Sequence, residues 1–342
     1  MKKGVKKATM SDIAKMLGVS KNSVSLALNE KPGVSDDLRR RITELAQKMD
    51  YGRLSNLASS KSKCLIVVVP NYIRHDTFFY SDVFWAIEEE SKLQSCITIT
   101  TSLSAEDEKE LVLPTIPQEM NVLGFLLVGI TSDLYLEKLH QSGLPIVSVD
   151  ISHNNVATNS ISSTNIASGY LATKHLIECG HRQIAFVGPI FVAQSVYERW
   201  CGFEQAMLQY GLDLFPKCNI LGSKDQVELF DTVEVLGKYL KDFTCFPTAW
   251  FCAGDRIAVA MISILSRKFK IPDEISIIGF DDLPIAQTVK PKLTTIHVDR
   301  KLMGKMAVTR LLQLQVDRSQ ILSICLPGQL IIRDSVRNLT VD

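Results

Sequence analysis

The chain has 342 residues, of which 46% are apolar and 22% are charged, a composition typical of a soluble globular protein with two or three domains. Its net charge of +1 is unevenly distributed, because residues 1–63 carry 14 Lys and Arg against 6 Asp and Glu, whereas the remaining residues carry 24 against 31. A basic head on an acidic body predicts that only the head contacts phosphates, and no run approaches the ~18 apolar residues of a membrane span.

The first residues, MKKGVKKATMSD, are charged but precede no apolar run, so we expect no signal peptide and a cytoplasmic protein. The eight cysteines form no C-x-x-C pair, and most of them fall in apolar runs. We therefore expect reduced thiols rather than disulfides or metal ligands.

Residues 9–29, TMSDIAKMLGVSKNSVSLALN, predict two short helices joined by a tight turn. Thr9 has the position of an N-cap, with Asp12 at the capping-box spacing, and Gly18 ends the first helix. Ser20 then begins a second helix whose exposed start is rich in hydrogen-bonding side chains. This is the layout of a helix-turn-helix, which places the start of its second helix against base edges. A helical hairpin that only packs is the alternative.

A third helix is predicted from Ser35, with acidic residues in its first turn and an apolar stripe that ends at Met49. Residues 52–63, GRLSNLASSKSK, are polar and rich in serine, which predicts a linker between this head and the rest of the chain.

From Cys64 onward the pattern changes to continuous apolar runs, typical of buried parallel strands, that alternate with amphipathic helical stretches. The predicted strands are 64–70, 96–101, 122–130, 144–150, 182–188, 247–254 and 274–282. The predicted helices are 81–94, 105–119, 133–142, 167–179, 195–210, 226–241 and 256–269. This alternation predicts a doubly wound α/β fold, and the number of strands favours two lobes with parallel sheets. In such sheets a ligand binds beyond the carboxyl ends of the strands.

Six segments, in order along the chain, resemble the lactose/galactose repressor (LacI/GalR) family of bacterial transcriptional regulators. They are TMSDIAKMLGVSKNSVSLALN (9–29), GYLATKHLIECGHRQIAFVGP (169–189), ERWCGFEQAM (198–207), FCAGDRIAVA (251–260), IPDEISIIGFDD (271–282) and PKLTTIHVDRKLMGKMAVTRLL (291–312). The resemblance implies an all-α helix-turn-helix head on an α/β body of the type I periplasmic-binding-protein-like fold, with a small-molecule effector between its two lobes. It also implies a homodimer bound to double-stranded operator DNA.

The resemblance divides the chain into a DNA-binding head (1–51), a hinge linker (52–63) and an effector-binding and dimerisation body (64–342). Within the body, we expect the N-lobe at about 64–162 plus 294–320 and the C-lobe at about 163–290 plus 321–336.

Carried over residue by residue, Lys21, Asn22 and Leu26 match the base-reading positions of the family's second helix. An Asn amide suits adenine and a Lys suits guanine or phosphate, whereas a Leu can only touch a thymine methyl or pack. The residues expected at DNA are Thr9, Ser20, Lys21, Asn22, Ser23, Ser25, Leu26, Asn29, Leu54 and Leu57.

In the cleft, Phe78 and Phe79 match an aromatic pair near the first strand, and three polar residues match positions that contact effector in relatives. Among these, Arg199 offers a planar donor fork suited to sugar hydroxyls, carboxylates or phosphates, while Asp281 could instead cap a loop. The residues expected at the effector are Asn71, Phe78, Phe79, Asp150, Arg199, Gly254 and Asp281.

The chain departs from the family pattern in two places. Arg53 stands where the linker usually carries Pro, and Leu54 and Leu57 are the candidates for the minor-groove Leu that kinks DNA. Gly254 stands where many sugar-binding members have Asn, which removes one polar contact.

These features predict a transcriptional repressor controlled by a sugar or related metabolite, with no cofactor and no metal. A solute-binding protein for transport is one alternative, against which the basic head and the lack of a signal peptide argue. An enzyme on the α/β body is another, but the sequence has no G-x-S-x-G, G-x-x-x-x-G-K-S/T, G-x-G-x-x-G or H-E-x-x-H motif.

Overall fold

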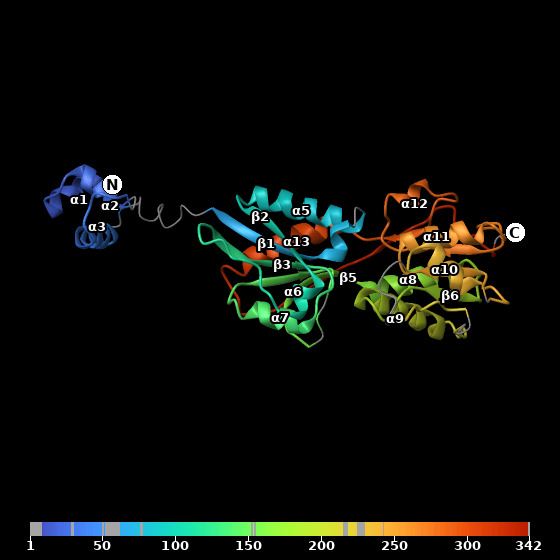
Figure 1. Ribbon diagram of the computed structural model, residues 1–342. Helices are drawn as coiled ribbons and strands as arrows, with labels where there is room; N and C mark the ends of the chain where they lie inside the picture. Colours follow the sequence, from blue (N-terminus) through green and yellow to red (C-terminus); the bar gives the residue numbers. More distant parts are fainter. Residues whose placement is uncertain are drawn as a thin grey trace, which may run out of the picture. The chain divides into compact units, whose positions relative to one another are not determined.

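The computed structural model describes residues 9–28, 31–49, 51, 62–75, 78–151, 153, 155–214, 218–223, 230–241 and 243–340. The chain divides into a small unit around the N-terminal helices and a large α/β unit, and the larger one has two lobes (Figure 1).

The head contains α1 (Met10–Leu17), α2 (Lys21–Leu28) and α3 (Asp36–Lys48), so the predicted helix pair and third helix are confirmed. Apolar residues at three- and four-residue spacing give each helix one inward face. These faces meet in a single core made of Ile13, Ala14, Val24, Ala27, Leu28, Ile42, Ala46 and Tyr51.

The first lobe is built on a six-stranded sheet with the order β10-β5-β4-β3-β1-β2. Its strands are β1 (Lys63–Pro70), β2 (Ile97–Leu103), β3 (Asn121–Val128), β4 (Ile146–Val149), β5 (Asn159–Ser163) and β10 (Ser323–Leu326). The 3-10 helix η1 (Asn71–His75) follows β1 directly. On one face α5 (Phe79–Leu93) packs against α13 (Arg300–Gln313), and α6 (Ala105–Lys109) and α7 (Asp133–His140) cover the other (Figure 1). Because helices cover both faces, the inner strands β1 and β3 are largely apolar rather than alternating, whereas β5 is buried but polar.

The second lobe has a parallel three-stranded sheet, β6 (Ile184–Val187), β7 (Ala249–Cys252) and β8 (Ser276–Ile278), beside an antiparallel pair, β9 (Thr295–His297) and β11 (Gln329–Ile331). Its helices are α8 (Asn165–Glu178), α9 (Gln194–Gln209), α10 (Val233–Leu240), α11 (Asp255–Leu265) and α12 (Ile285–Thr288). Helices α8 and α9 lie against one another on one side of this lobe, with α11 and α12 on the other (Figure 1).

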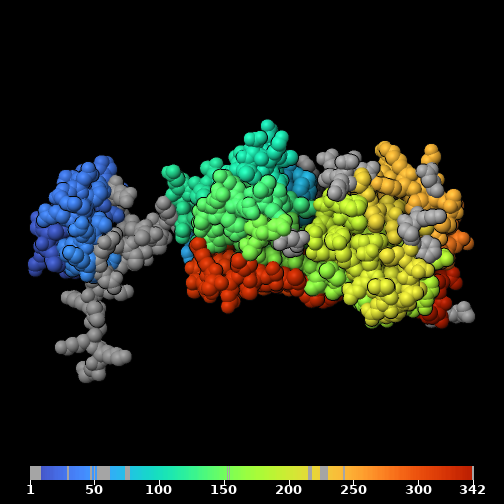
Figure 2. All heavy atoms as spheres, turned by 90° about the horizontal axis from the view of Figure 1, so that it is seen from below, coloured from blue at the N-terminus to red at the C-terminus, as the bar shows by residue number. Residues whose placement is uncertain are grey.

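The chain passes between the lobes after β5, before α13 and again after β10. In Figure 2 the red atoms from the last part of the chain accordingly lie against both the green first lobe and the yellow second lobe. Strand β10 pairs in parallel with β5 and therefore belongs to the first lobe, although residues 321–336 were expected in the C-lobe. A short segment after a helix carries too weak an apolar pattern to assign it to one sheet rather than the other.

Each of the seven predicted strands overlaps an observed strand, but β5, β9, β10 and β11 were not predicted. The helix expected at 105–119 is wrong beyond Lys109, because Leu111 has a positive φ of 55° and Pro114 and Pro117 follow. The helix expected at 226–241 begins only at Val233 among the described residues.

Candidate functional sites

The start of α2 is the exposed edge of the head. Lys21 and Asn22 are exposed, whereas Ser23, Ser25 and Leu26 are half-buried. The inward side of the helix is fixed by burial of Val24, Ala27 and Leu28 in the head core, so its rotation leaves the first two side chains pointing outward. A cation and an amide are thereby presented together at a helix start, which suits phosphate and base-edge contacts.

Two caps hold the helix pair. The side chain of Thr9 accepts a hydrogen bond from Asp12 N while Asp12 Oδ2 accepts one from Thr9 N at 2.8 Å, which confirms the predicted capping box. Ser20 Oγ accepts a hydrogen bond from Ser23 N at 2.9 Å and so caps α2. Gly18 ends α1 with a φ of 68°, the left-handed conformation that glycine adopts readily.

Arg39 of α3 is a structural residue of the head in this structure. Its guanidinium donates to the carbonyl oxygens of Leu26, Ala27 and Lys31, at 3.4, 3.2 and 2.8 Å. It therefore closes the carboxyl end of α2, where a positive charge is favourable. The remaining expected DNA contacts, Asn29, Leu54 and Leu57, lie outside the described residues.

In the body, the expected residues Arg199, Gly254 and Asp281 come together in the second lobe. Arg199 lies on α9, and its Nη2 is 3.2 Å from Asp281 Oδ1. A Cβ atom added to Gly254, at the start of α11, would lie 3.3 Å from Asp281 Oδ2. The guanidinium is buried over the ring of Phe280, 3.7 Å from its centroid.

Asp150 follows β4 in the first lobe with a left-handed φ of 62°, and its Oδ2 accepts a hydrogen bond from Tyr80 at 2.8 Å. Burial raises the pKa of Asp150 to about 7, although Arg199 and the Tyr80 hydroxyl act in the opposite direction. The carboxylates of Asp281 and Glu198 add to the rise. Asp150 Oδ1 is buried and has no hydrogen-bond partner among the described residues, so it is available to a ligand.

A small cavity of about 10 Å³ adjoins Asp150, enough for about one water molecule. Of the expected effector residues only Asp150 lines it, and Arg199 reaches its wall through Asn165. Its described lining comprises Ile130, Asp150, Ile151, Ser162, Asn165, Gln194, Ser195 and Glu198. These residues come from both lobes, so an effector would enter by separating them.

The expected aromatic pair is split. Phe79 is buried at the start of α5, in edge contact with Tyr80 and with the Arg300 guanidinium 5.8 Å from its ring centroid. Phe78 is 38% exposed, and Asn71 is exposed at the start of η1. Neither of these two lines the cavity at Asp150.

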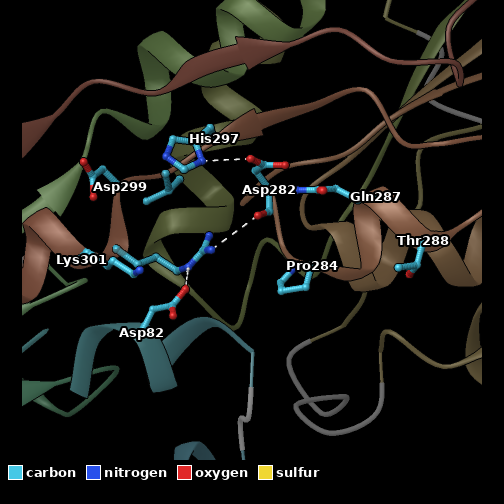
Figure 3. Close-up of a pocket in the computed structure, with 10 residues that line it drawn as sticks. Asp82, Asp282, Pro284, Gln287, Thr288, His297, Asp299 and Lys301 are labelled. Carbon is cyan, nitrogen blue, oxygen red and sulfur yellow. Dashed lines mark hydrogen bonds and ion pairs between the residues drawn. The ribbon is translucent and has the colours of Figure 1, made fainter. Parts of the chain in front are cut away.

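A larger cavity of about 610 Å³ lies near Asp82, Asp282 and His297 (Figure 3). Two of the three acids among its described lining residues are paired with basic side chains. His297 Nδ1 is 3.0 Å from Asp282 Oδ2, and Arg333 is 2.6 Å from Asp282 Oδ1. Asp82 is paired with Arg300 at 3.0 Å. Asp82 and Asp282 are thus paired within the protein, whereas Asp150 Oδ1 has no partner among the described residues, which makes Asp150 the candidate effector position despite the smaller volume of its cavity.

Glu198, Asn165 and Tyr80 are site residues that the sequence did not identify. Glu198 precedes Arg199 in the motif ERW, and Tyr80 follows the aromatic pair, so both stood beside assigned residues. Asn165 lies just beyond the carboxyl end of β5, where ligands bind in sheets of this kind. It could not be identified from the sequence because β5 was not predicted. Asp255 is buried in the first turn of α11, where its carboxylate accepts hydrogen bonds from Leu283 N and the Thr295 hydroxyl.

Among the described residues, no helix is long and apolar enough to cross a membrane. The described part of the chain also contains no group of three or more His, Cys, Asp or Glu side chains that could hold a metal ion.

Comparison with known proteins places both parts of the chain. Residues 9–53 match the family model for bacterial regulatory proteins of the lacI family, and residues 173–336 match that of the periplasmic binding protein-like domain. The HTH-type transcriptional repressor PurR of Pasteurella multocida (strain Pm70) is 29% identical over 338 residues, covering 97% of this chain and 99% of that protein.

Two solved structures share the fold. The lac repressor dimer bound to operator and the anti-inducer ONPF has a TM-score of 0.68 and 22% identity, covering 97% of this chain and 100% of its own. A LacI family regulator from Enterococcus faecium with bound ribose has a TM-score of 0.65 and 26% identity, covering 81% of this chain and 99% of its own. Together with the helix-turn-helix head and the two-lobed α/β body, these matches show that the chain belongs to the lactose/galactose repressor (LacI/GalR) family of bacterial transcription regulators.

Proposed function

We propose that the chain is a repressor that binds a specific operator in double-stranded DNA through the start of α2. The observation that carries this is the outward pair Lys21 and Asn22 on a capped, rigid helix within a basic head. Thr9 and Ser20 are exposed at the starts of α1 and α2, and Ser23 and Ser25 are half-buried in α2; in this proposal they position the head on the phosphates.

The experiment is selection of bound sequences from a random DNA library with the full chain, followed by gel shift on the selected site. Asn22→Ala should weaken binding by roughly 5- to 150-fold and relax the preference at one base pair. Lys241→Ala, a charge-matched change on an exposed lysine of the body, should leave affinity unchanged. If a chain lacking residues 1–63 binds the same site equally well, the proposal fails.

The second half of the proposal is control by a small molecule held between the lobes at Asp150. The buried Oδ1 atom without a donor supports this position, and the ribose-bound relative supports a sugar or related metabolite as its class. Thermal shift of the full chain against sugars and nucleosides tests it, and Asp150→Ala should abolish the shift produced by any ligand found.

A homodimer follows from the same proposal, because a two-fold operator requires a two-fold protein. On the first lobe, Trp85 and Leu93 of α5 are 69% and 71% exposed, beside Ile97 of β2, which is 45% exposed. β2 is the edge of the sheet, so this apolar surface suits a second copy. Sedimentation should give a dimer, and Trp85→Glu should shift it towards monomer.

We further propose that the chain is not an enzyme and that it acts in the cytoplasm, where a bacterial operator lies. The domain division into 1–51, 52–63 and 64–342 belongs to the same proposal, with β10 moved to the first lobe.

A further inference from the structure

The charged groups that line the cavity at Asp150 are all of one sign. Among its described lining residues, the charged ones are Asp150 and Glu198, and none is basic. The neutral polar ones are amides and hydroxyls, which adapt to donors or acceptors.

Arg199, the nearest cation, is already engaged by the protein. Its Nε donates to Asn165 Oδ1 at 3.0 Å, and its Nη1 donates to Ala253 O at 2.6 Å. Its Nη2 is 3.2 Å from Asp281 Oδ1, so the one guanidinium charge is matched by one carboxylate. Arg199 also acts on Asp150, because it lowers the pKa of that carboxyl against the effect of burial, whereas Glu198 has no matching cation among the described side chains that line the cavity.

Glu198 is held in place by neutral donors. Asn165 Nδ2 donates to its Oε2 at 3.0 Å, and Gln194 Nε2 donates to its Oε1 at 3.3 Å. Each carboxylate oxygen has further lone pairs, so Glu198 keeps acceptor capacity towards the cavity. Asp150 Oδ1, buried and without a described donor, is a second and independent sign that a ligand donates here.

An anionic ligand would lie against the Glu198 carboxylate and against the buried Asp150, which cannot balance a negative charge in either protonation state. Like charges in a desolvated site repel strongly, and such repulsion is an ordinary means of rejecting unwanted ligands. Hydroxyl and ammonium groups, in contrast, can donate to Asp150 Oδ1, which has no described donor, and to the remaining lone pairs of Glu198.

We infer that the effector is a small molecule that carries hydroxyl or amine donors and no phosphate or carboxylate, and that Glu198 is the residue that rejects anions. This rests on the proposed function of the cleft. It defines the chemical class of the ligand. Arg199 considered alone would have predicted an anionic ligand instead.

The test is calorimetric titration of the full chain, without DNA, with matched ligand sets. Each neutral monosaccharide or nucleoside is paired with its phosphorylated form, and each monosaccharide also with its amino form. We expect binding only among the neutral and amino members, with the phosphorylated partner at least ten times weaker. Tighter binding of a phosphorylated member, or no binding by any neutral or amino member, overturns the inference.

Glu198→Gln separates charge from packing, because an amide of nearly the same shape replaces the carboxylate. The variant should narrow the gap between a neutral ligand and its phosphorylated form by about tenfold. Glu204→Gln removes the same charge from the same helix away from the cavity and is the matched control. An equal change in both variants, or none in Glu198→Gln, overturns the role of Glu198. DNA binding is measured in a separate experiment. Failure to bind any operator would therefore contradict the proposed function, whereas the ligand titrations alone decide whether the inference about the effector is correct.

Discussion

Arg300 Nε lies 3.0 Å from Asp82 Oδ2, and the same guanidinium also reaches the second lobe of the body. Arg300 begins α13, and Asp82 lies in the first turn of α5, both in the first lobe. The other guanidinium nitrogens donate to the carbonyl oxygens of Asp281 and Asp282 in the second lobe. One planar fork therefore ties α5 to the loop after β8, beside the proposed effector site.

Replacing Arg300 with Ala should lower the free energy of unfolding by about 2 kcal/mol, since it removes charge-assisted hydrogen bonds at a buried site. Asp82→Asn should have a smaller effect, because the Asp82 side chain is 35% exposed and remains hydrated without its partner. Urea unfolding measures both. Lys301→Ala is the control, because Lys301 is the exposed neighbour of Arg300 in the chain and its side chain takes no part in these hydrogen bonds. An equal loss at Lys301 would show that the effect comes from the start of α13 rather than from the link.

The sequence predicted those helices and strands that have a clear pattern of apolar residues. Buried strands such as β1 read as unbroken apolar runs, and the caps at Thr9 and Ser20 follow from local spacing. Strand β5, NSISS, is buried but polar, so no hydrophobic pattern reveals it. Its neighbour β10 was placed in the wrong lobe because pairing is decided across more than 150 residues.

The site was predictable only in part, for a related reason. The family motifs pointed to Asp150, Arg199 and Asp281, but a motif does not reveal which donors the protein itself uses. The engagement of Arg199 by Asn165 and Ala253 is a tertiary fact, and it changes which ligand charge the cleft accepts.

Asp150 should make stability depend on pH. Its pKa is about 7 in the folded protein against a reference value of 3.8, so the folded state binds the proton more tightly. The stabilisation is fully present below about pH 4 and is lost as pH rises towards 7, with an upper limit on the order of 4 kcal/mol.

Asp150→Asn lacks this titration, so the variant should gain stability relative to the unmodified chain as pH rises from 4 to 7. Urea unfolding at several pH values measures the difference. The nearby ionisable groups, Tyr80, Arg199, Asp281 and Glu198, are present in both proteins and largely cancel in it. Parallel pH profiles would contradict the buried, shifted carboxyl.

Gly202 sets how closely α9 approaches α8, and thus where Arg199 sits. A Cβ atom at Gly202 would lie 2.1 Å from Ile166 O and 2.6 Å from Tyr170 N, both backbone atoms that cannot move aside. Gly202→Ala should therefore destabilise the chain by about 3 kcal/mol through overpacking. Gly237→Ala, in α10 with no atom within 4 Å of the added Cβ, should stabilise it by about 0.5–1 kcal/mol. Thermal unfolding of the two variants should give changes of opposite sign.

A substitution at Thr9 distinguishes two roles for this residue, capping of α1 and contact with DNA. Thr9→Ala removes the hydroxyl that accepts from Asp12 N and should destabilise α1 by about 1 kcal/mol. Amide hydrogen exchange in the full chain should then show about fivefold lower protection in α1, while Thr9→Ser should keep it. If protection in α1 is unchanged but operator affinity falls, Thr9 acts through DNA and not as a cap. If Ser behaves like Ala, the hydroxyl is not the cause, because Ser caps at least as well as Thr.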